Sequence, residues 1–142
     1  MSATNPLKAP FEDARVDPKL KLSALWAATT FCYIYGDYFE LYVPGKLASM
    51  LEEKMGPLGP VTQGVLLGTS ILLAIPSVMV FLSLVLKPRF NRPINIVLGA
   101  LYSVIMIAAI QRAWIFYKFF GVVEIALTAA IVWYAWKWPR AT

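Results

Sequence analysis

The chain has 142 residues, of which 59% are hydrophobic and only 15% are charged, and its formal net charge is +5. Soluble domains carry about 25% charged residues and cannot hide this much apolar surface at this size, whereas a membrane protein need not hide it. The basic residues lie in the short gaps between apolar runs, which argues against nucleic acid as a partner and favours contact with membrane lipids.

The chain contains one cysteine, Cys32, and no histidine. A single cysteine cannot form an intrachain disulfide or a paired-thiol relay, so Cys32 is expected to be a small packing residue. Histidine is the commonest metal ligand and the usual general base near neutral pH. We therefore expect no metal site and no cofactor.

Four apolar runs approach the length of about 20 residues that a membrane-spanning helix needs. They cover about 22–43, 61–86, 94–112 and 119–138. The sequence thus predicts an all-α, polytopic membrane four-helix bundle. It forms one domain, 22–138, between a cytoplasmic N-terminal tail, 1–21, and a cytoplasmic C-terminal tail, 139–142.

The connection between the first two spans runs from Pro44 to Pro60. Within it, Lys46–Met55 places apolar and charged residues on opposite faces, which predicts a short helix in the membrane interface. A solvated loop is the alternative. The other two connections are short, so the second span is expected to pair with the third, and the third with the fourth.

The second span contains Pro76, which should bend it because proline removes one backbone hydrogen bond. Ser77 or Ser83 is expected to bind the carbonyl group that loses its partner. Small residues four apart mark places where helices can approach closely. Such pairs are Gly64 with Gly68 and Gly99 with Ser103, and they favour packing within the bundle over dimerisation.

The distribution of lysine and arginine predicts the orientation. Nine of these residues lie in the two tails and in the second connection, and four lie on the other side. The nine-residue side should be cytoplasmic. Aromatic residues cluster at both rims, as in the aromatic belts of membrane interfaces, and are expected to be anchors.

Three acidic residues inside the predicted spans are the candidates for function: Asp37, Glu40 and Glu124. A buried ionisable group is costly unless it is paired or hydrated. Asp37 and Glu124 are each expected to lie about 8–9 Å below the outer rim, at equal depth. The inner halves of the spans are expected to be almost wholly apolar.

Further polar side chains fall near the same level. The predicted ligand-binding residues are Asp37, Glu124, Tyr33, Tyr38, Gln111, Arg112 and Glu40. Tyrosine hydroxyl groups can satisfy a carboxylate, and Arg112 can act as its counter-charge. One interpretation is an outward-facing pocket that holds a cationic or proton-bearing group. The other is an ion-paired cluster that holds the four helices together, with Glu40 extending toward water.

No phosphate-binding loop, dinucleotide fingerprint, zinc signature or nucleophile elbow is present, so the case for an enzyme is weak. Our main hypothesis is a non-enzymatic protein that binds or translocates a lipophilic or cationic small molecule, or a lipid. One alternative is a structural or accessory subunit of a larger membrane complex or homo-oligomer. The other is a membrane isomerase or hydrolase that uses Asp37 and Glu124 as an acid–base pair.

The segment Leu22 to Leu47, LSALWAATTFCYIYGDYFELYVPGKL, resembles the opening of a family of small bacterial integral membrane proteins of unknown function. The resemblance is strongest over Tyr33–Phe39 and Val43–Lys46, and it extends over all four spans. It implies a four-helix protein of the bacterial inner membrane. The architecture is also similar to that of DoxX-like proteins and of sterol-isomerase and sigma-2-type ligand-binding proteins, which place acidic residues in a membrane-embedded pocket.

Overall fold

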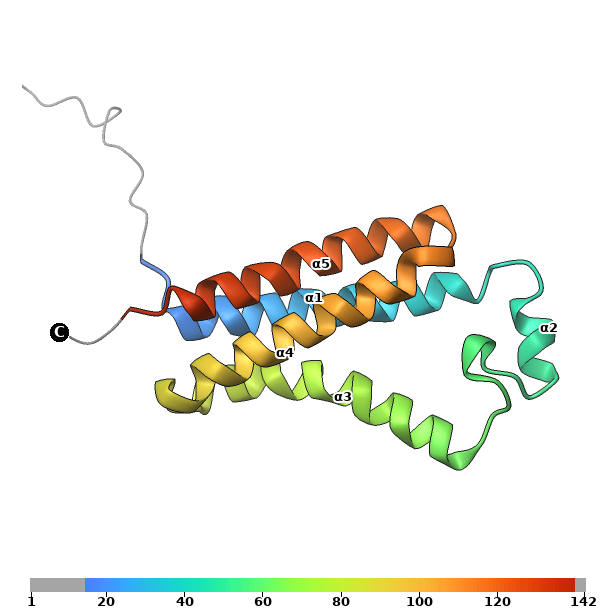
Figure 1. Ribbon diagram of the computed structural model, residues 1–142, viewed down its shortest axis with the longest axis horizontal. Helices are drawn as coiled ribbons and strands as arrows, with labels where there is room; N and C mark the ends of the chain where they lie inside the picture. The colour runs from blue at the N-terminus through green and yellow to red at the C-terminus, as the bar shows by residue number, and fades with distance from the viewer. Residues whose placement is uncertain (1–14, 140–142) are drawn as a thin grey trace, which may run out of the picture.

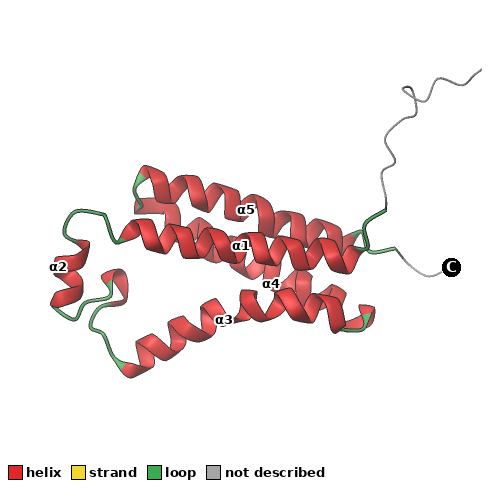
Figure 2. Cartoon of the chain, turned by 180° about the vertical axis from the view of Figure 1, so that it is seen from behind, coloured by secondary structure: helices red, strands yellow, loops and turns green. Residues whose placement is uncertain are grey.

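The computed structural model describes residues 15–139. In chain order, its helices are α1 (Pro18–Glu40), α2 (Lys46–Leu51), the 3-10 helix η2 (Gly56–Leu58), α3 (Gln63–Val85), α4 (Pro88–Ala109), the 3-10 helix η3 (Ile110–Arg112) and α5 (Ile115–Trp136). The part of the chain that the structure describes forms no β-strand, apart from one isolated bridge between Lys54 and Pro60. The long helices are α1, α3, α4 and α5. Figures 1 and 2 show α2 beyond one end of them.

Three of the long helices are long and apolar enough to cross a membrane. They are α3, α4 together with η3, and α5, whose most apolar windows have a mean hydropathy of 2.4, 2.1 and 1.9. At about 1.5 Å per residue, helices of this length match a hydrocarbon layer of about 30 Å. The protein is therefore a membrane protein. Helix α1 is equally long but carries charged residues near both of its ends.

The two ends of the bundle differ. We call the end that carries the connection 41–62 and η3 the loop end, and the end that carries the α3–α4 turn and the last residues of α5 the terminal end (Figure 1). The described parts of the predicted tails, residues 15–21 and Pro139, lie at the terminal end. Residues 1–14 and 140–142 of these tails lie outside the described residues, whereas Pro18–Lys21 already belong to α1.

The helix boundaries differ from the edges of the apolar runs. Helix α1 begins at Pro18 because Asp17 accepts a hydrogen bond from the Lys19 backbone N–H at 2.7 Å, and proline suits the first helical position. Helix α4 likewise begins at Pro88, before its apolar run. Helix α5 begins at Ile115, four residues before the expected position.

The observed helix pairs agree only partly with the pairs predicted from the sequence. Helix α4 packs along α5, as expected from their short connection, and α1 packs against both α3 and α5. Helices α3 and α4 make few backbone contacts although a two-residue turn joins them. Figures 1 and 2 show α3 leaving its neighbours toward the loop end. The second and third spans therefore pair near the terminal end, where Asn91 of α4 donates to the Ser83 carbonyl oxygen of α3, and not along the first half of α3.

The divergence of α3 begins near Pro76, which is buried inside the helix. Proline has no N–H, so the carbonyl group of Leu72 loses its helical partner. The Tyr102 hydroxyl group of α4 donates a hydrogen bond to this carbonyl oxygen at 2.5 Å. Neither expected serine does so, because Ser77 donates to Leu73 and Ser83 donates to Asn95.

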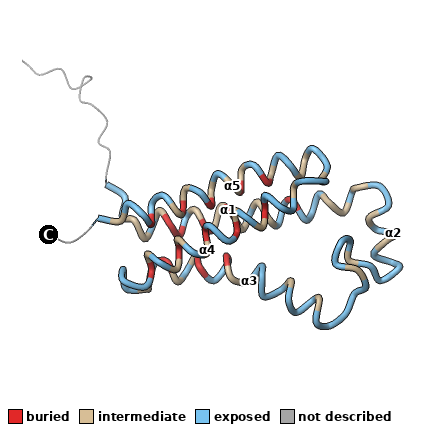
Figure 3. The backbone as a smooth tube through the Cα atoms, in the orientation of Figure 1, coloured by how far each residue is buried: buried red, intermediate tan, exposed pale blue. Residues whose placement is uncertain are grey.

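The first half of α3, before the proline, is largely uncovered. Residues 63–74 are exposed except for Val65 and Thr69, which are half-buried (Figure 3). A Cβ atom at Gly68 would meet nothing within 4 Å. The Gly64–Gly68 pair is therefore not used for packing within the described chain. The Gly99–Ser103 pair is used, because Gly99 lies against the Thr128 backbone.

A buried polar network joins three helices near the terminal end. The Trp26 indole N–H of α1 donates to Asn95 Oδ1 of α4 at 2.7 Å, and Asn95 Nδ2 donates to Asn91 Oδ1 at 2.6 Å. Asn91 Nδ2 in turn donates to the Ser83 carbonyl oxygen of α3 at 2.6 Å. All four side chains are fully buried. The expectation that the inner halves of the spans are almost wholly apolar is therefore wrong.

Candidate ligand-binding site

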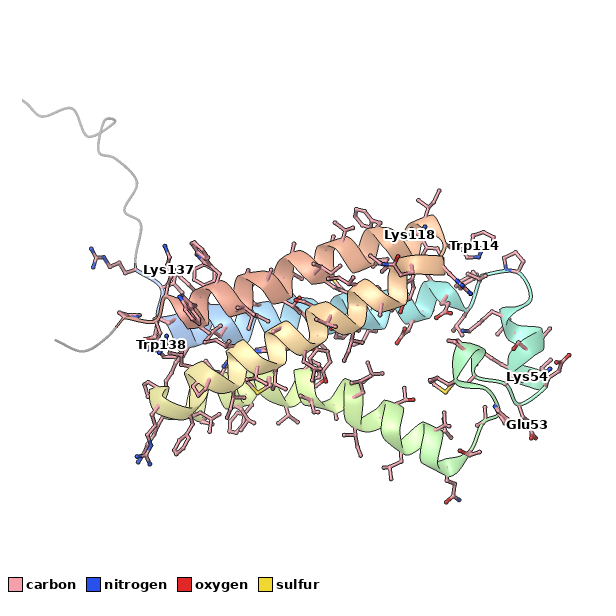
Figure 4. The ribbon with its side chains drawn as sticks, viewed as in Figure 1. Glu53, Lys54, Trp114, Lys118, Lys137 and Trp138 are labelled. Carbon is pink, nitrogen blue, oxygen red and sulfur yellow. The ribbon has the colours of Figure 1, made fainter. Side chains whose placement is uncertain are left out.

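A cavity of about 550 Å³ lies at the loop end, between α1, the α1–α3 connection and the α4–α5 turn. Its lining residues are Glu40, Val43, Lys46, Met55, Pro57, Leu58, Ala109, Arg112, Ala113, Trp114, Phe116 and Tyr117. Figure 4 shows Trp114 at this end, beside the start of α5. The cavity is thus built from the ends of helices and from the longest connection, rather than from the middle of the bundle.

Two short turns bring its charged residues together. Gly45 has a φ of 81°, a left-handed conformation that lets the chain turn back after Pro44, and this turn places Lys46 beside Glu40. On the other side, η3 ends at Arg112, and the extended Ala113 and Trp114 start α5. The turn at Gly45 therefore positions one side of the cavity, and the turn between η3 and α5 positions the other.

The α1–α3 connection closes the cavity with a tight internal loop. Helix α2 was expected over Lys46–Met55 but ends at Leu51, and Glu53 follows with a φ of 57°. Two backbone hydrogen bonds of 2.7 Å, from Met55 to Gly59 and from Val61 to Glu53, hold the loop. This arrangement presents Met55, Pro57 and Leu58 to the cavity.

The charges of the residues that line the cavity do not cancel. Lys46 Nζ lies 2.6 Å from Glu40 Oε1, and both side chains are partly buried. Arg112 also lines the cavity, and it forms no ion pair within residues 15–139. The lining residues therefore carry one carboxylate and two cations, and Asp37, one turn before Glu40 on α1, places a second carboxylate near Lys46. The guanidinium group of Arg112 forms no ion pair with the described residues.

An aromatic pocket of about 400 Å³ adjoins this cavity. It is lined by Phe39, Tyr42, Val43, Pro44, Trp114, Phe116 and Phe120. Val43, Trp114 and Phe116 line both spaces, so the two are contiguous. Phe39 stacks on Phe120, with ring centroids 6.3 Å apart, which joins α1 to α5 beside the pocket. The combined space has a charged part and an aromatic part.

Glu124 and Asp37 lie apart from these two spaces. Glu124 is buried between α1 and α5, with 2% of its surface exposed, and its Oε2 atom has no hydrogen-bond partner among the described residues. Asp37 lies on α1 and is exposed. Neither residue lines the cavity or the aromatic pocket.

The two carboxyl groups also lie at different depths. Gly36 of α1 lies opposite Tyr117 and Phe120 of α5, since a Cβ atom there would meet both at 3.9 Å. Glu124 lies four residues beyond Phe120, which is about 6 Å deeper along the helix. The expected equal depth is therefore wrong, because α5 begins four residues earlier than the apolar run indicated.

The remaining predicted site residues also lie outside the two spaces. Tyr33 is half-buried against Tyr102, with ring centroids 6.3 Å apart. The Tyr38 hydroxyl group lies 3.0 Å from that of Tyr42, and Gln111 donates to the Ile107 carbonyl oxygen at 2.7 Å. Of the seven predicted residues, the structure brings only Glu40 and Arg112 to the cavity.

The prediction missed Lys46, Trp114 and Tyr117 as lining residues. The sequence places Lys46 at the start of an interfacial helix and in the count of charges, and the Pro44–Gly45 turn between Lys46 and Glu40 is the signal that could have joined them. Trp114 and Tyr117 were assigned to an aromatic anchor. Both residues follow Arg112 closely in the sequence, and this proximity could have indicated that they line the same cavity as Arg112.

The geometry is suited to binding an amphipathic molecule. Charged groups at one side can hold a polar headgroup, and the contiguous aromatic pocket can accept an apolar chain. The described residues contain no group of three histidine, cysteine, aspartate or glutamate side chains that could hold a metal ion.

Comparison with protein families identifies the chain. Residues 11–142 match the model of DUF6326, which is described as a family of unknown function, and the chain belongs to this family. Searches of curated proteins and of solved structures found no match.

Proposed function

We propose that this DUF6326 protein is a non-enzymatic membrane protein that binds a lipophilic molecule or lipid in the cavity at its loop end. The observation that carries the proposal is the continuity of the charged cavity with the aromatic pocket through Val43, Trp114 and Phe116. A molecule with one polar end and one apolar end would satisfy both parts at once.

The charges of the lining favour an anionic headgroup over a cationic one. The Glu40 carboxylate is already engaged by Lys46 at 2.6 Å, whereas the described chain offers Arg112 no acidic partner. A guanidinium group binds phosphate or carboxylate through paired hydrogen bonds. The expectation of a cationic ligand at Asp37 is therefore replaced here by an anionic amphiphile at Arg112.

We further propose that α1 is a fourth membrane span, with the loop end outside and both termini in the bacterial cytoplasm. Helix α1 packs along α3 and α5, which are apolar enough to cross the membrane. The excess of lysine and arginine at the terminal end supports this orientation. Basic and aromatic side chains also meet there, with Lys21 over Tyr134 at 5.1 Å. The ligand would then enter from the outer surface or the outer leaflet.

The proposal is tested by lipid binding to the purified full-length protein. Native mass spectrometry would compare an anionic probe, phosphatidylglycerol, with a zwitterionic one, phosphatidylcholine. We expect tighter retention of the anionic lipid, and we expect Arg112→Ala to weaken it about tenfold or more, because a charge-assisted hydrogen bond contributes about 1.5–3 kcal/mol.

Lys118→Ala is the matched control. Lys118 is exposed near Trp114 (Figure 4), and it lines neither the cavity nor the aromatic pocket. This variant removes one positive charge from the same end and should retain the lipid. Equal loss in both variants would show general charge attraction, and unchanged binding in both would place the lipid elsewhere.

A role as an accessory subunit is the second candidate, and the uncovered half of α3 favours it. The Gly64–Gly68 face contacts nothing in the described chain, and such faces serve close helix–helix packing in membranes. Co-purification of one stoichiometric partner, lost in Gly68→Leu, would support this role. A stable monomer in native membranes would contradict it. The acid–base alternative gains no support, since neither Asp37 nor Glu124 lines either space.

A further inference from the structure

Glu124 is the one buried side chain in residues 15–139 with a polar atom that lacks a hydrogen-bond partner. Only 2% of the surface of Glu124 is exposed, and the unpartnered atom is Oε2. By contrast, the buried amides of Asn91 and Asn95 bond to each other within α4, Asn91 also donates to Ser83 of α3, and Asn95 accepts from Trp26 of α1. Since buried polar groups are nearly always satisfied, the exception at Glu124 calls for a specific explanation.

The surroundings of Glu124 offer no counter-charge. The titratable groups near it are acidic or neutral: Cys32, Tyr33 and Asp37 from α1 and Tyr117 from α5 itself. From α4, Tyr102 lies beside Tyr33 and is also neutral. From η3, Arg112 is directed to the loop-end cavity, and Lys46 beside it is paired with Glu40. Helix α3 packs on α1 and not on α5.

Two kinds of positive partner could satisfy a carboxylate in this position, a metal cation or a proton. A metal cation needs several oxygen or nitrogen ligands, and the described residues contain no group of three histidine, cysteine, aspartate or glutamate side chains that could hold one. A proton needs only one oxygen atom. An ionised, unpaired carboxyl group in the membrane interior is also far more costly than a neutral one.

We propose that Glu124 is a proton-binding site inside the membrane, and that Asp37 exchanges this proton with the loop end. In the exchange, Glu124 Oε2 gives up its proton and becomes a carboxylate, while the Asp37 carboxylate accepts the proton and becomes neutral. Asp37 then releases it to water. Asp37 is suited to this role because it is exposed and lies about one helical turn nearer the loop end.

This inference does not depend on the lipid site, because Glu124 and Asp37 line neither the cavity nor the aromatic pocket. Lipid retention and proton binding can therefore fail separately. Arg112→Ala should leave the behaviour of Glu124 unchanged. Glu124→Gln should leave lipid retention unchanged.

The test uses the full-length protein and dicyclohexylcarbodiimide, an apolar reagent that reacts with protonated carboxyl groups. Mass spectrometry of the digested protein would locate the adduct. We expect it on Glu124 near neutral pH, and above its midpoint the labelled fraction should fall about tenfold per pH unit, as the protonated fraction does. Asp37→Asn removes a neighbouring negative charge and should shift the midpoint to lower pH. Glu53→Gln, a change at an exposed loop residue, should not shift it.

Infrared spectroscopy provides a readout that does not depend on access of the reagent. The C=O stretch of a protonated carboxyl group should be present in the wild type near neutral pH and absent in Glu124→Gln. A wild-type protein without this band, or labelling of Glu124 that does not change with pH, would overturn the proposal. Protection of Glu124 by sodium or magnesium ions at constant pH would overturn it in favour of a metal cation.

Discussion

At the scale of single residues, the fold depends on polar atoms that find partners on other helices. The carbonyl group of Leu72 is the clearest case, since Pro76 removes its partner and Tyr102 replaces it. Within hydrocarbon an unsatisfied carbonyl group has no water to bind, so such a replacement is required rather than incidental. The proline in the sequence indicated that this carbonyl group needs another hydrogen-bond donor. It did not indicate which helix supplies the donor.

Tyr102→Phe tests this bond without altering the ring. The aromatic contacts of Tyr102 with Trp26 and Tyr33 should persist, while the Leu72 carbonyl group loses its donor. We expect a loss of about 1–2 kcal/mol in the free energy of unfolding, measured by denaturation in detergent or bicelles. Tyr35→Phe is the control, because Tyr35 is exposed and has no hydrogen bond to the described residues. Equal stability of the two variants would contradict the assignment.

The buried network of Trp26, Asn91 and Asn95 illustrates why parts of the structure were missed. Each residue is visible in the sequence near a predicted inner rim, where a polar side chain is normally read as facing the lipid headgroups. Their burial follows from the packing of α1 against both α3 and α5, which no single span reveals. A sequence shows which side chains need partners, and the pairing of helices decides which partners they have.

At the scale of helices, the four long elements were predictable because each contains an apolar run of sufficient length. Their boundaries were less so, because capping residues such as Asp17 lie outside these runs. The same error affected the predicted depths of the site residues. Because α5 starts earlier than expected, Glu124 lies deeper than Asp37. Glu40 and Arg112 were placed correctly at the loop end because each lies close to the end of its helix.

The α4–α5 pair gives a prediction at this scale, because the two helices approach closely at Gly99. A Cβ atom there would lie 2.9 Å from Val132 Cγ2 and 3.1 Å from the Thr128 carbonyl oxygen. The second contact is backbone and cannot move without shifting the helix. We expect Gly99→Ala to destabilise the protein by about 1–3 kcal/mol, measured by unfolding.

Gly68→Ala is the matched control on α3. A Cβ atom at Gly68 would meet nothing within 4 Å, and alanine favours the helix by up to about 1 kcal/mol. This variant should be unchanged or slightly more stable in the isolated protein. Destabilisation at Gly68 and none at Gly99 would mean that the helices pair differently.

At the scale of the whole molecule, the main prediction concerns the number of spans and their direction. In a Cys32→Ser background, single cysteines would be introduced by Val16→Cys before α1, Lys54→Cys at the loop end and Lys137→Cys after α5. Figure 4 shows Lys54 and Lys137 at opposite ends of the bundle. A maleimide that cannot cross membranes should label only Lys54→Cys in intact cells, and the other two after permeabilisation.

The three positions separate the alternatives. If Val16→Cys and Lys54→Cys are labelled from the same side, α1 does not cross the membrane and the protein has three spans. If Lys137→Cys is the accessible site in intact cells, the orientation is reversed. Labelling of Lys54→Cys alone supports four spans with the loop-end cavity outside.

The uncovered half of α3 has a consequence for the way the protein fits its bilayer. Residues 63–74 are held to the bundle only through the proline bend at one end and the α1–α3 connection at the other, while the buried polar network fixes the remaining half of the helix. Helices adapt to a thinner or thicker bilayer by tilting, at small cost. In this protein, residues 63–74 can tilt while the rest of α3 stays in place. A change in membrane thickness would then alter the bend angle at Pro76 without disturbing the packing around Asn91 and Asn95.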